Sequence, residues 1–235
     1  MNSGLATLRA VPMFERLDAT LLTRLDAITA VTHLPPGHLL CRQGEQAAHL
    51  HILLDGQVAL SGIAPDGAET VLEVAQPVSH FVLAAVLTDM PYLMSARTVT
   101  RSRVLMLPAP GLRALTRTEP ALALALLGAM ARDYRAMVRQ VRDLRLRTAA
   151  QRLGCYLLAL VAEAPGNTAR LRLPFDKALL ASRLGSRQDS LSRAFATLRE
   201  YGVETHGAAV ALHNIAALQA FALPDELADL PTDPG

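Results

Sequence analysis

The sequence contains no tryptophan and only two cysteines among its 235 residues. Cys41 and Cys155 lie far apart and neither belongs to a C-x-x-C pair, which argues against a disulfide framework, a zinc ribbon and a thiolate-held iron–sulfur cluster. A basic segment followed by an unbroken apolar run is missing from the N-terminus, and the apolar run Ala121–Ala131 is too short to span a bilayer. We therefore expect a cytoplasmic protein with reduced thiols and no membrane partner.

The sequence also lacks a strong excess of charge, since its formal net charge is only +2. Any contact with nucleic acid must then come from a local basic patch rather than from the whole chain. What the chain has in quantity is apolar residues, at 51% of the total. That content and length suffice for one large or two ordinary domains with real cores.

The first half of the chain changes from a helical to a strand pattern. Apolar residues recur near helical spacing over Leu8–Thr32, which predicts one or two short helices before Pro35–Pro36 breaks the pattern. From there to Pro108, short apolar alternations are separated by glycine turns. This pattern predicts an antiparallel β-roll or barrel, with a short helix at Phe81–Leu87. The expected turn glycines are Gly44, Gly56 and Gly67.

A long helix is predicted from Thr118 onward, with Thr118 as its cap, Glu119 in its first turn and Pro120 where a proline is tolerated. Apolar residues then follow in steps of three and four, which we call the seam, and arginines occupy the outer face. Such a narrow stripe favours a two-helix coiled coil in a homodimer, the alternative being a helix that lies on its own domain's core. The seam residues are Leu127, Met130, Tyr134, Met137, Val141 and Leu144, and the outer arginines are Arg132, Arg135, Arg139 and Arg142.

The segment Leu179–Tyr201 has the pattern of a helix-turn-helix. Gly185 supplies the turn, and Ser186 with Asp189 three residues later predicts a capping box for the second helix. Leu191, Phe195 and Leu198 share one face that packs on the first helix. The opposite face predicts a DNA-recognition surface, although an ordinary helical hairpin with a solvated polar face has a similar pattern. Its residues are Arg187, Gln188, Asp189, Ser192, Arg193 and Arg199.

The flanking segments complete a winged domain with an excess of basic residues, as a phosphate-contacting surface requires. We expect a helix at Thr148–Glu163, a short strand at Leu171, a two-stranded wing turning at His206–Gly207 and a last helix at Ile215–Phe221. The predicted fold class is α+β. The expected parts are a β-roll sensor domain over 1–117, a dimerisation helix over 118–147, a winged helix-turn-helix over 148–223 and a loose tail over 224–235.

In this order of parts the chain resembles the Crp–Fnr family of bacterial transcription regulators. The stretch LPPGHLLCRQGEQAAHLHILLDGQVAL is similar to the family's roll pattern, and Asp189-Ser-Leu-Ser-Arg193 is similar to its Glu-x-x-Ser-Arg motif, with aspartate for glutamate. The resemblance implies a homodimer that binds a palindromic operator in double-stranded DNA and contacts RNA polymerase. It also implies that Arg193 contacts guanine, which suits a guanidinium because O6 and N7 can accept together.

The resemblance also bears on the effector. In the cyclic-nucleotide-binding branch, a glutamate holds the ribose and an Arg-Ser pair holds the phosphate. This chain places Leu83–Ala84 and Met94–Ser95 there, and a cyclic phosphate needs a cation that Met94 cannot supply. We therefore expect that the protein does not respond to cyclic AMP or GMP. The effector pocket predicted by this alignment contains Ala84, Met94, Ser95 and Arg97, although an arginine on a strand is often only solvated.

Three longer stretches resemble the nitric-oxide-responsive NnrR and Dnr groups: AAVLTDMPYLMSARTVTRSRVLMLP, RQVRDLRLRTAAQRLGCYLL and LPFDKALLASRLG. That branch implies nitric oxide sensing through haem and control of nitrogen-oxide metabolism, and imidazole is a suitable axial ligand. The sequence does not choose among the roll histidines, each of which could equally be a surface residue, and it has no C-x-x-C-H for covalent haem. Another small molecule, or redox chemistry at Cys41, stays an alternative. The candidate ligands are His33, His38, His49, His51 and His80.

An enzymatic role is the remaining alternative. A roll with histidines could be a metal-dependent cupin-like enzyme, but His49-x-His51 has no acidic partner at convincing spacing. The sequence also has no G-x-S-x-G, P-loop or dinucleotide fingerprint. A dimer that binds another protein through the long helix is a further alternative. Since neither uses the arginine-bearing helix, we expect a DNA-binding protein and not an enzyme.

Overall fold

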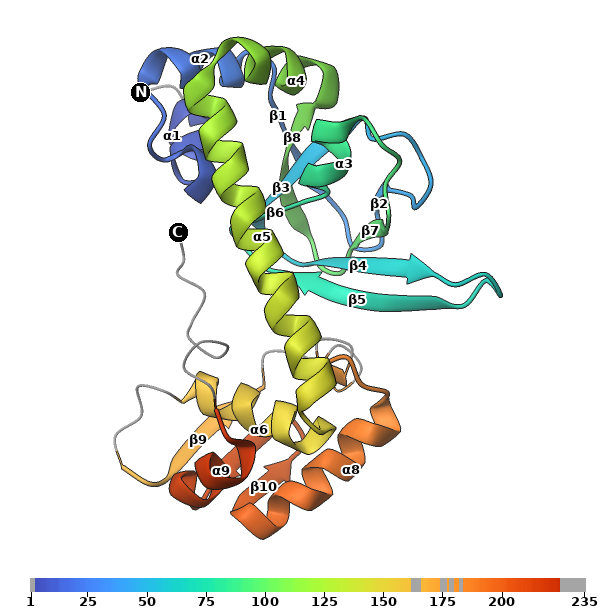
Figure 1. The fold of residues 1–235 in the computed structure, drawn as a ribbon, viewed down its shortest axis with the longest axis vertical. Coiled ribbons are helices and arrows are strands. Elements are labelled where there is room, and N and C mark those ends of the chain that lie inside the picture. The colour runs from blue at the N-terminus through green and yellow to red at the C-terminus, as the bar shows by residue number, and fades with distance from the viewer. Residues whose placement is uncertain (1–2, 162–165, 174–176, 178–179, 182–183, 225–235) are drawn as a thin grey trace. The chain divides into compact units, whose positions relative to one another are not determined.

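The computed structural model describes residues 3–161, 166–173, 177, 180–181 and 184–224 (Figure 1). It separates into two compact units, divided within the long helix between Tyr134 and Arg135. Each unit has a hydrophobic core of its own. Among the described residues, no helix combines the length and the apolar character needed to cross a bilayer.

Short helices open the first unit: α1 (Ser3–Arg9), the 3-10 turn η1 (Pro12–Phe14) and α2 (Ala19–Asp26). Asp18 caps α2 by accepting from the backbone N–H of Leu21 at 2.8 Å. The predicted helical region therefore ends at Asp26. Val31 and Thr32 belong to a strand instead, because these β-branched residues pair with Leu105 and Val104 of β8.

Two four-stranded antiparallel sheets form the roll, which confirms the predicted fold class. Their orders are β1-β8-β3-β6 and β2-β7-β4-β5. The three predicted turn glycines have positive φ between 85° and 90°, as expected. The strands are β1 (Ala30–Leu34), β2 (Leu39–Cys41), β3 (His49–Asp55), β4 (Val58–Ile63), β5 (Glu69–Ala75), β6 (Ser79–Phe81), β7 (Ser95–Thr98) and β8 (Ser102–Pro108).

The predicted helix at Phe81–Leu87 is α3 (Leu83–Thr88), but Phe81 itself belongs to β6. A second helix, α4 (Ala109–Thr118), was not predicted. Its start, Pro108-Ala-Pro-Gly, has the composition of a loop, yet proline is allowed in a first helical turn. Gly111 also packs closely, since a Cβ there would lie 3.2 Å from Cδ1 of Ile28 and that side chain would have to shift slightly.

The long helix α5 runs from Pro120 to Leu146. The prediction that Thr118 caps it is wrong, because Thr118 is the last residue of α4. The backbone carbonyl of Glu119 instead accepts the first bond of α5, from the N–H of Ala123 at 3.1 Å. The Glu119 side chain forms an ion pair with Arg24 of α2, a contact that spacing along the sequence could not reveal.

The second unit is a winged helix-turn-helix, as predicted. Its N-terminal helix is capped by Thr148 and Gln151, which bond to each other's backbone N–H groups. The three strands form one antiparallel sheet in the order β10-β11-β9, so the strand before the helix-turn-helix joins the wing. Leu179 and residues 225–235 of the predicted tail lie outside the described residues. The elements are α6 (Ala149–Leu160), β9 (Ala169–Arg172), α8 (Gln188–Leu198), η2 (Arg199–Tyr201), β10 (Val203–His206), β11 (Ala209–Leu212) and α9 (Ile215–Ala222).

Candidate functional site

Helix α8 exposes every residue predicted to contact DNA. Its opposite face is buried, with Leu191, Phe195 and Leu198 in the core of the second unit beside Leu180 and Ala181. The polar face is therefore held in place by apolar packing on the other side of the helix. The exposed residues are Arg187, Gln188, Asp189 and Ser192, then Arg193 at the helix centre and Arg199 just past its end.

The turn before α8 is made by Gly185, as predicted, with φ +57°. A Cβ at this position would also lie 2.4 Å from Cδ2 of Leu144, so a larger residue would have to displace that side chain as well as adopt a left-handed backbone. The predicted cap is wrong. Arg187 occupies the cap position without a side-chain bond, because the hydroxyl of Ser186 accepts a bond from Nη2 of Arg152 at 3.1 Å instead.

Arg152 of α6 holds this turn and was missed as a functional residue. Its Nε donates to the carbonyl of Leu184 at 2.9 Å, and its Nη1 donates to the carbonyl of Arg147 at 2.8 Å. Partial burial lowers the pKa of the Arg152 guanidinium, while the Asp143 carboxylate acts in the opposite direction. In the sequence Arg152 is one basic residue among several, and nothing in its local pattern predicts three partners that lie before and after it in the chain.

The wing adds a polar cluster at the end of α8. An open pocket there is lined by Arg199 together with Glu204, His206 and His213 of the wing. The carboxylate of Glu204 lies 3.1 Å from Nε2 of His213 and 3.8 Å from Nε2 of His206. Arg199 therefore shares an open pocket with an acid, Glu204, whose carboxylate lies near two histidines.

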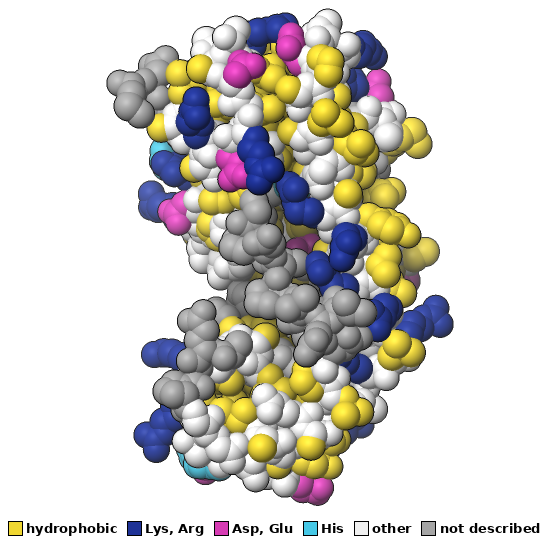
Figure 2. Space-filling view, turned by 60° about the vertical axis from the view of Figure 1, so that its left-hand side comes forward, with side chains coloured by type: hydrophobic (Ala, Val, Ile, Leu, Met, Phe, Trp, Pro, Cys, Tyr) yellow, Lys and Arg dark blue, Asp and Glu magenta, His cyan; other side chains and the backbone are white. Residues whose placement is uncertain are grey.

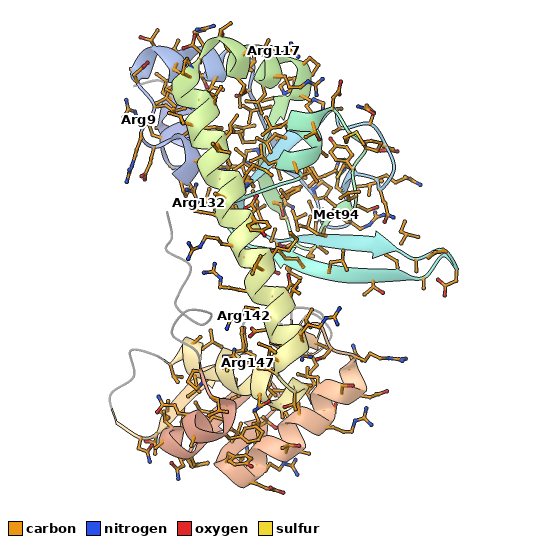
Figure 3. All side chains as sticks on the ribbon, in the orientation of Figure 1. Arg9, Met94, Arg117, Arg132, Arg142 and Arg147 are labelled. Carbon is orange, nitrogen blue, oxygen red and sulfur yellow. The ribbon has the colours of Figure 1, made fainter. Side chains whose placement is uncertain are left out.

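Most of the seam is exposed on α5. Leu127, Tyr134, Met137 and Val141 are each more than half exposed, which is unusual for a row of large apolar side chains. Figure 2 shows yellow hydrophobic and dark-blue basic side chains together at the surface of the face in view, and Figure 3 labels Arg132 and Arg142 on this helix. Two seam residues differ from the prediction: Met130 packs against the core of the first unit, and Leu144 meets Gly185.

The predicted effector residues lie on two elements. Ala84 is exposed on α3, whereas Met94, Ser95 and Arg97 lie in and just before β7. Ser95 is buried and its hydroxyl accepts from the backbone N–H of Gln43 at 3.0 Å. Arg97 is not merely solvated, because its Nη1 donates to a backbone carbonyl, that of Gly37, at 2.8 Å.

The roll histidines differ sharply in environment. His51 is 1% exposed, and neither of its ring nitrogens has a hydrogen-bond partner among the described residues. Burial, followed by the charge of His49, lowers the pKa of His51 to about 4, so the ring is neutral at physiological pH. The rings of His49 and His51 lie 6.2 Å apart, as expected for residues i and i+2, which lie on one face of a strand.

The other candidates are less suited to be ligands. His33 and His38 are exposed. His80 is bonded through Nε2 to the carboxylate of Asp133 at 3.0 Å. His49 is half-buried, and its backbone N–H and carbonyl both bond to the Tyr92 hydroxyl, each at 3.0 Å. His51 is therefore the candidate whose ring is buried and has no hydrogen-bond partner among the described residues, a property that only the packing reveals.

Cys41 is buried in β2, with its Sγ 3.9 Å from the carbonyl of Met94. Burial raises the pKa of the Cys41 thiol to about 11, outweighing a lowering contribution from the backbone of Ala96. Because the thiolate is the reactive form, a thiol in this state is a poor redox sensor.

Comparison with known proteins matches each unit to a family. Residues 31–119 match the cyclic nucleotide-binding domain, and residues 151–221 match the Crp-like helix-turn-helix domain. A Ruegeria pomeroyi structure, provisionally described as a cyclic nucleotide binding protein, is 30% identical with a TM-score of 0.61, covering 94% of this chain and 98% of that one.

Two further relatives are informative. The structure of DNR from Pseudomonas aeruginosa is 29% identical with a TM-score of 0.51, and the match covers 94% of this chain and 98% of that one. The CRP-like cAMP-activated global transcriptional regulator of Mycobacterium tuberculosis is 24% identical over 193 residues, which is 81% of this chain and 86% of that protein.

Proposed function

Because the chain belongs to the Crp–Fnr family of DNA-binding transcription regulators, we propose that it acts as a homodimer whose α8 helices bind the two halves of a palindromic operator. The observation that carries this proposal is the polar face of α8, fully exposed on a helix whose other face is buried. Arg193 would bind guanine bidentately, and Asp189 would accept from a cytosine amino group or orient Arg193. Contact with RNA polymerase is part of the proposal by family resemblance.

The exposed seam supports the dimer. Coiled coils bury residues at alternating steps of three and four, and five of the six seam residues are exposed in the single chain. A second copy of α5 is the partner with a matching stripe, and two-fold symmetry also matches a palindromic operator.

DNA recognition is tested by replacing Arg193 with alanine and measuring affinity by fluorescence anisotropy on an operator selected from random sequences. We expect a loss of about 1–3 kcal/mol on the selected site and little change on unrelated DNA at the same salt concentration. Arg117→Ala is the matched control, since it removes the same charge from an exposed site on α4 (Figure 3). Equal losses on all sequences would reduce Arg193 to a phosphate contact.

For the effector, we propose nitric oxide sensed through haem, with control of nitrogen-oxide metabolism as the consequence. Haem requires an imidazole with an available nitrogen, and His51 fits this requirement because both of its nitrogens lack partners among the described residues. When bound, haem would supply the iron to which the gas binds. His51 would hold it, and the neutral state of the ring keeps a lone pair available.

Two observations weigh against other effectors. Met94 is apolar and supplies no cation for a cyclic phosphate, and one N–H of the Arg97 guanidinium already donates to the carbonyl of Gly37. The buried, protonated thiol of Cys41 argues against redox sensing there. The second candidate is a different, uncharged small molecule. It too could form a hydrogen bond with the unpartnered ring nitrogens of His51.

The effector proposal is tested by absorption spectroscopy of anaerobic protein titrated with haem, before and after nitric oxide. We expect stoichiometric binding, a Soret band that shifts with the gas, and loss of both in His51→Ala but not in the exposed-site control His33→Ala. Binding of cyclic AMP by calorimetry, or an unchanged Soret band in His51→Ala, would contradict the assignment.

A further inference from the structure

Strand β6 lies between the buried His51 and the long helix. It has only three residues, forms the edge of its sheet and pairs with β3, placing Phe81 opposite His51 and His80 opposite Ile52. Because successive residues of a strand face opposite sides, Phe81 and His80 point away from each other. This three-residue strand thus directs Phe81 toward His51 and His80 toward the long helix.

On the inner side, Phe81 covers His51. Their rings are stacked with centroids 5.3 Å apart and planes only 6° from parallel. Both residues are buried, and Tyr92 approaches the same imidazole with a centroid distance of 6.4 Å. A molecule that reaches the ring nitrogens of His51 must share this closely packed space, so its entry would push on Phe81.

On the outer side, β6 holds the long helix. Nε2 of His80 lies 3.0 Å from Oδ2 of Asp133, which is on α5 (Figure 1). Asp133 directly precedes Tyr134, a residue of the exposed seam. The helix continues without interruption to Leu146. A change at Asp133 therefore acts on the helix next to the seam.

The buried polar atoms without a hydrogen-bond partner, in the part of the chain that the structure describes, all lie in β6, in the segment before it or in His51 beside it. The buried side-chain atoms without a hydrogen-bond partner there are both ring nitrogens of His51, Nε2 of Gln76 and Oγ of Ser79. Ser79 is the first residue of β6, and Gln76 lies in the segment that leads into it. A buried polar group without a partner is destabilising, so a shift that supplied partners here would be favourable.

We propose that β6 is a relay between the roll interior and the long helix. A molecule bound at His51 displaces Phe81, and the same movement of β6 weakens the contact of His80 with Asp133. The relay assigns a regulatory path to the sensing site proposed above and rests on that proposal for its biological role. The mechanical coupling itself depends only on contacts between described residues.

The coupling is tested by histidine-ring NMR on haem-free, DNA-free protein of full length. Asp133→Asn first gives the ring-nitrogen shifts of His80 without the Asp133 carboxylate. We then expect Phe81→Ala, and to a smaller degree Phe81→Leu, to move the His80 signals toward those of Asp133→Asn. Phe14→Ala is the matched control, because Phe14 is an equally buried phenylalanine of the same core that does not lie on β6.

A His80 signal that stays at its wild-type position in both Phe81 variants would overturn the relay. So would an equal movement in Phe14→Ala, because it would show a general loosening of the core. A further control, Glu119→Gln, removes the ion pair with Arg24 just before the start of the same helix and should leave His80 unchanged. The experiment uses neither haem nor DNA. If the protein bound no haem but showed the Phe81-specific shift, the relay would be supported and only the proposed effector would be contradicted.

Discussion

Arg152 gives the sharpest test of how the DNA-binding unit is held together. Its guanidinium makes three hydrogen bonds, to the carbonyls of Leu184 and Arg147 and to the hydroxyl of Ser186, at 2.8 to 3.1 Å. Arg152→Met keeps the aliphatic part of the side chain and removes all three. At about 1 kcal/mol for each partly exposed bond, we expect a loss of about 2–4 kcal/mol in the stability of this unit.

The two units need not unfold together, so a single melting temperature would mix them. Hydrogen exchange measured by mass spectrometry resolves the effect, using peptides from α8 and the wing. A loss of this size predicts exchange roughly 30- to 700-fold faster there, since each 1.4 kcal/mol is a factor of ten. Peptides from β3 and β8 in the first unit should be unaffected.

The control is Arg145→Met, which removes the same charge from an exposed position on α5. If Arg152→Met and Arg145→Met changed exchange equally, or if α8 retained wild-type protection without the guanidinium, the bonds of Arg152 would not be what holds the turn. The reasoning from its three contacts would then be refuted.

Two further outcomes follow from the roll and the seam. His51 stays neutral in the fold until about pH 4, whereas in the unfolded chain it takes up a proton near pH 6.5. The folded state therefore loses stability as the pH falls from 6.5 to 4, by up to about 3 kcal/mol in haem-free protein. His51→Phe should reduce that loss. The loss is measured at pH 7 and pH 5 by urea unfolding, with hydrogen exchange of the β3 amides as the signal, and an undiminished loss would show that other groups cause it. Replacing Met137 and Val141 together by glutamate should give monomers on light scattering, with Arg135→Glu as the control, and an intact dimer would refute the seam.

Local patterns were sufficient for the roll, the long helix, the wing and the buried face of α8, because each depends on spacing within one segment. Gly185 could be assigned to the turn for the same reason. The errors arose where a distant partner decided the outcome. Ser186 has the spacing of a cap, but its hydroxyl is taken by Arg152, which lies 34 residues earlier. Pro110 and Gly111 have the composition of a loop, but they lie in the first turn of α4, where proline is tolerated and Gly111 packs on Ile28.

The candidate effector site shows the same limit more strongly. His51 could be named from its residue type, but its burial and its lack of partners result from Phe81 and Tyr92, which meet it only in the fold. Alternation of apolar residues does not distinguish His51 from the exposed His33, since both lie in strands. The pairing of His80 with Asp133 was equally inaccessible, because it joins a strand that was not predicted to a helix 53 residues later.

The joining of β9 to the wing has a practical consequence. Leu171 pairs with Val210, and the backbone N–H of Leu173 bonds to the carbonyl of Ala208 at 2.8 Å, so the stretch from Leu173 to Val203 begins and ends in one sheet. Both ends of the stretch are thus anchored in one sheet, with β11 between them, so the stretch can be exchanged as a cassette. Grafting the corresponding stretch of another regulator between β9 and β10 would change which operator is bound while the sequences of the roll and of α5 stay the same. Such a graft should keep Gly185, which meets Leu144 of α5, and would turn an unknown signal into a reporter with a chosen promoter.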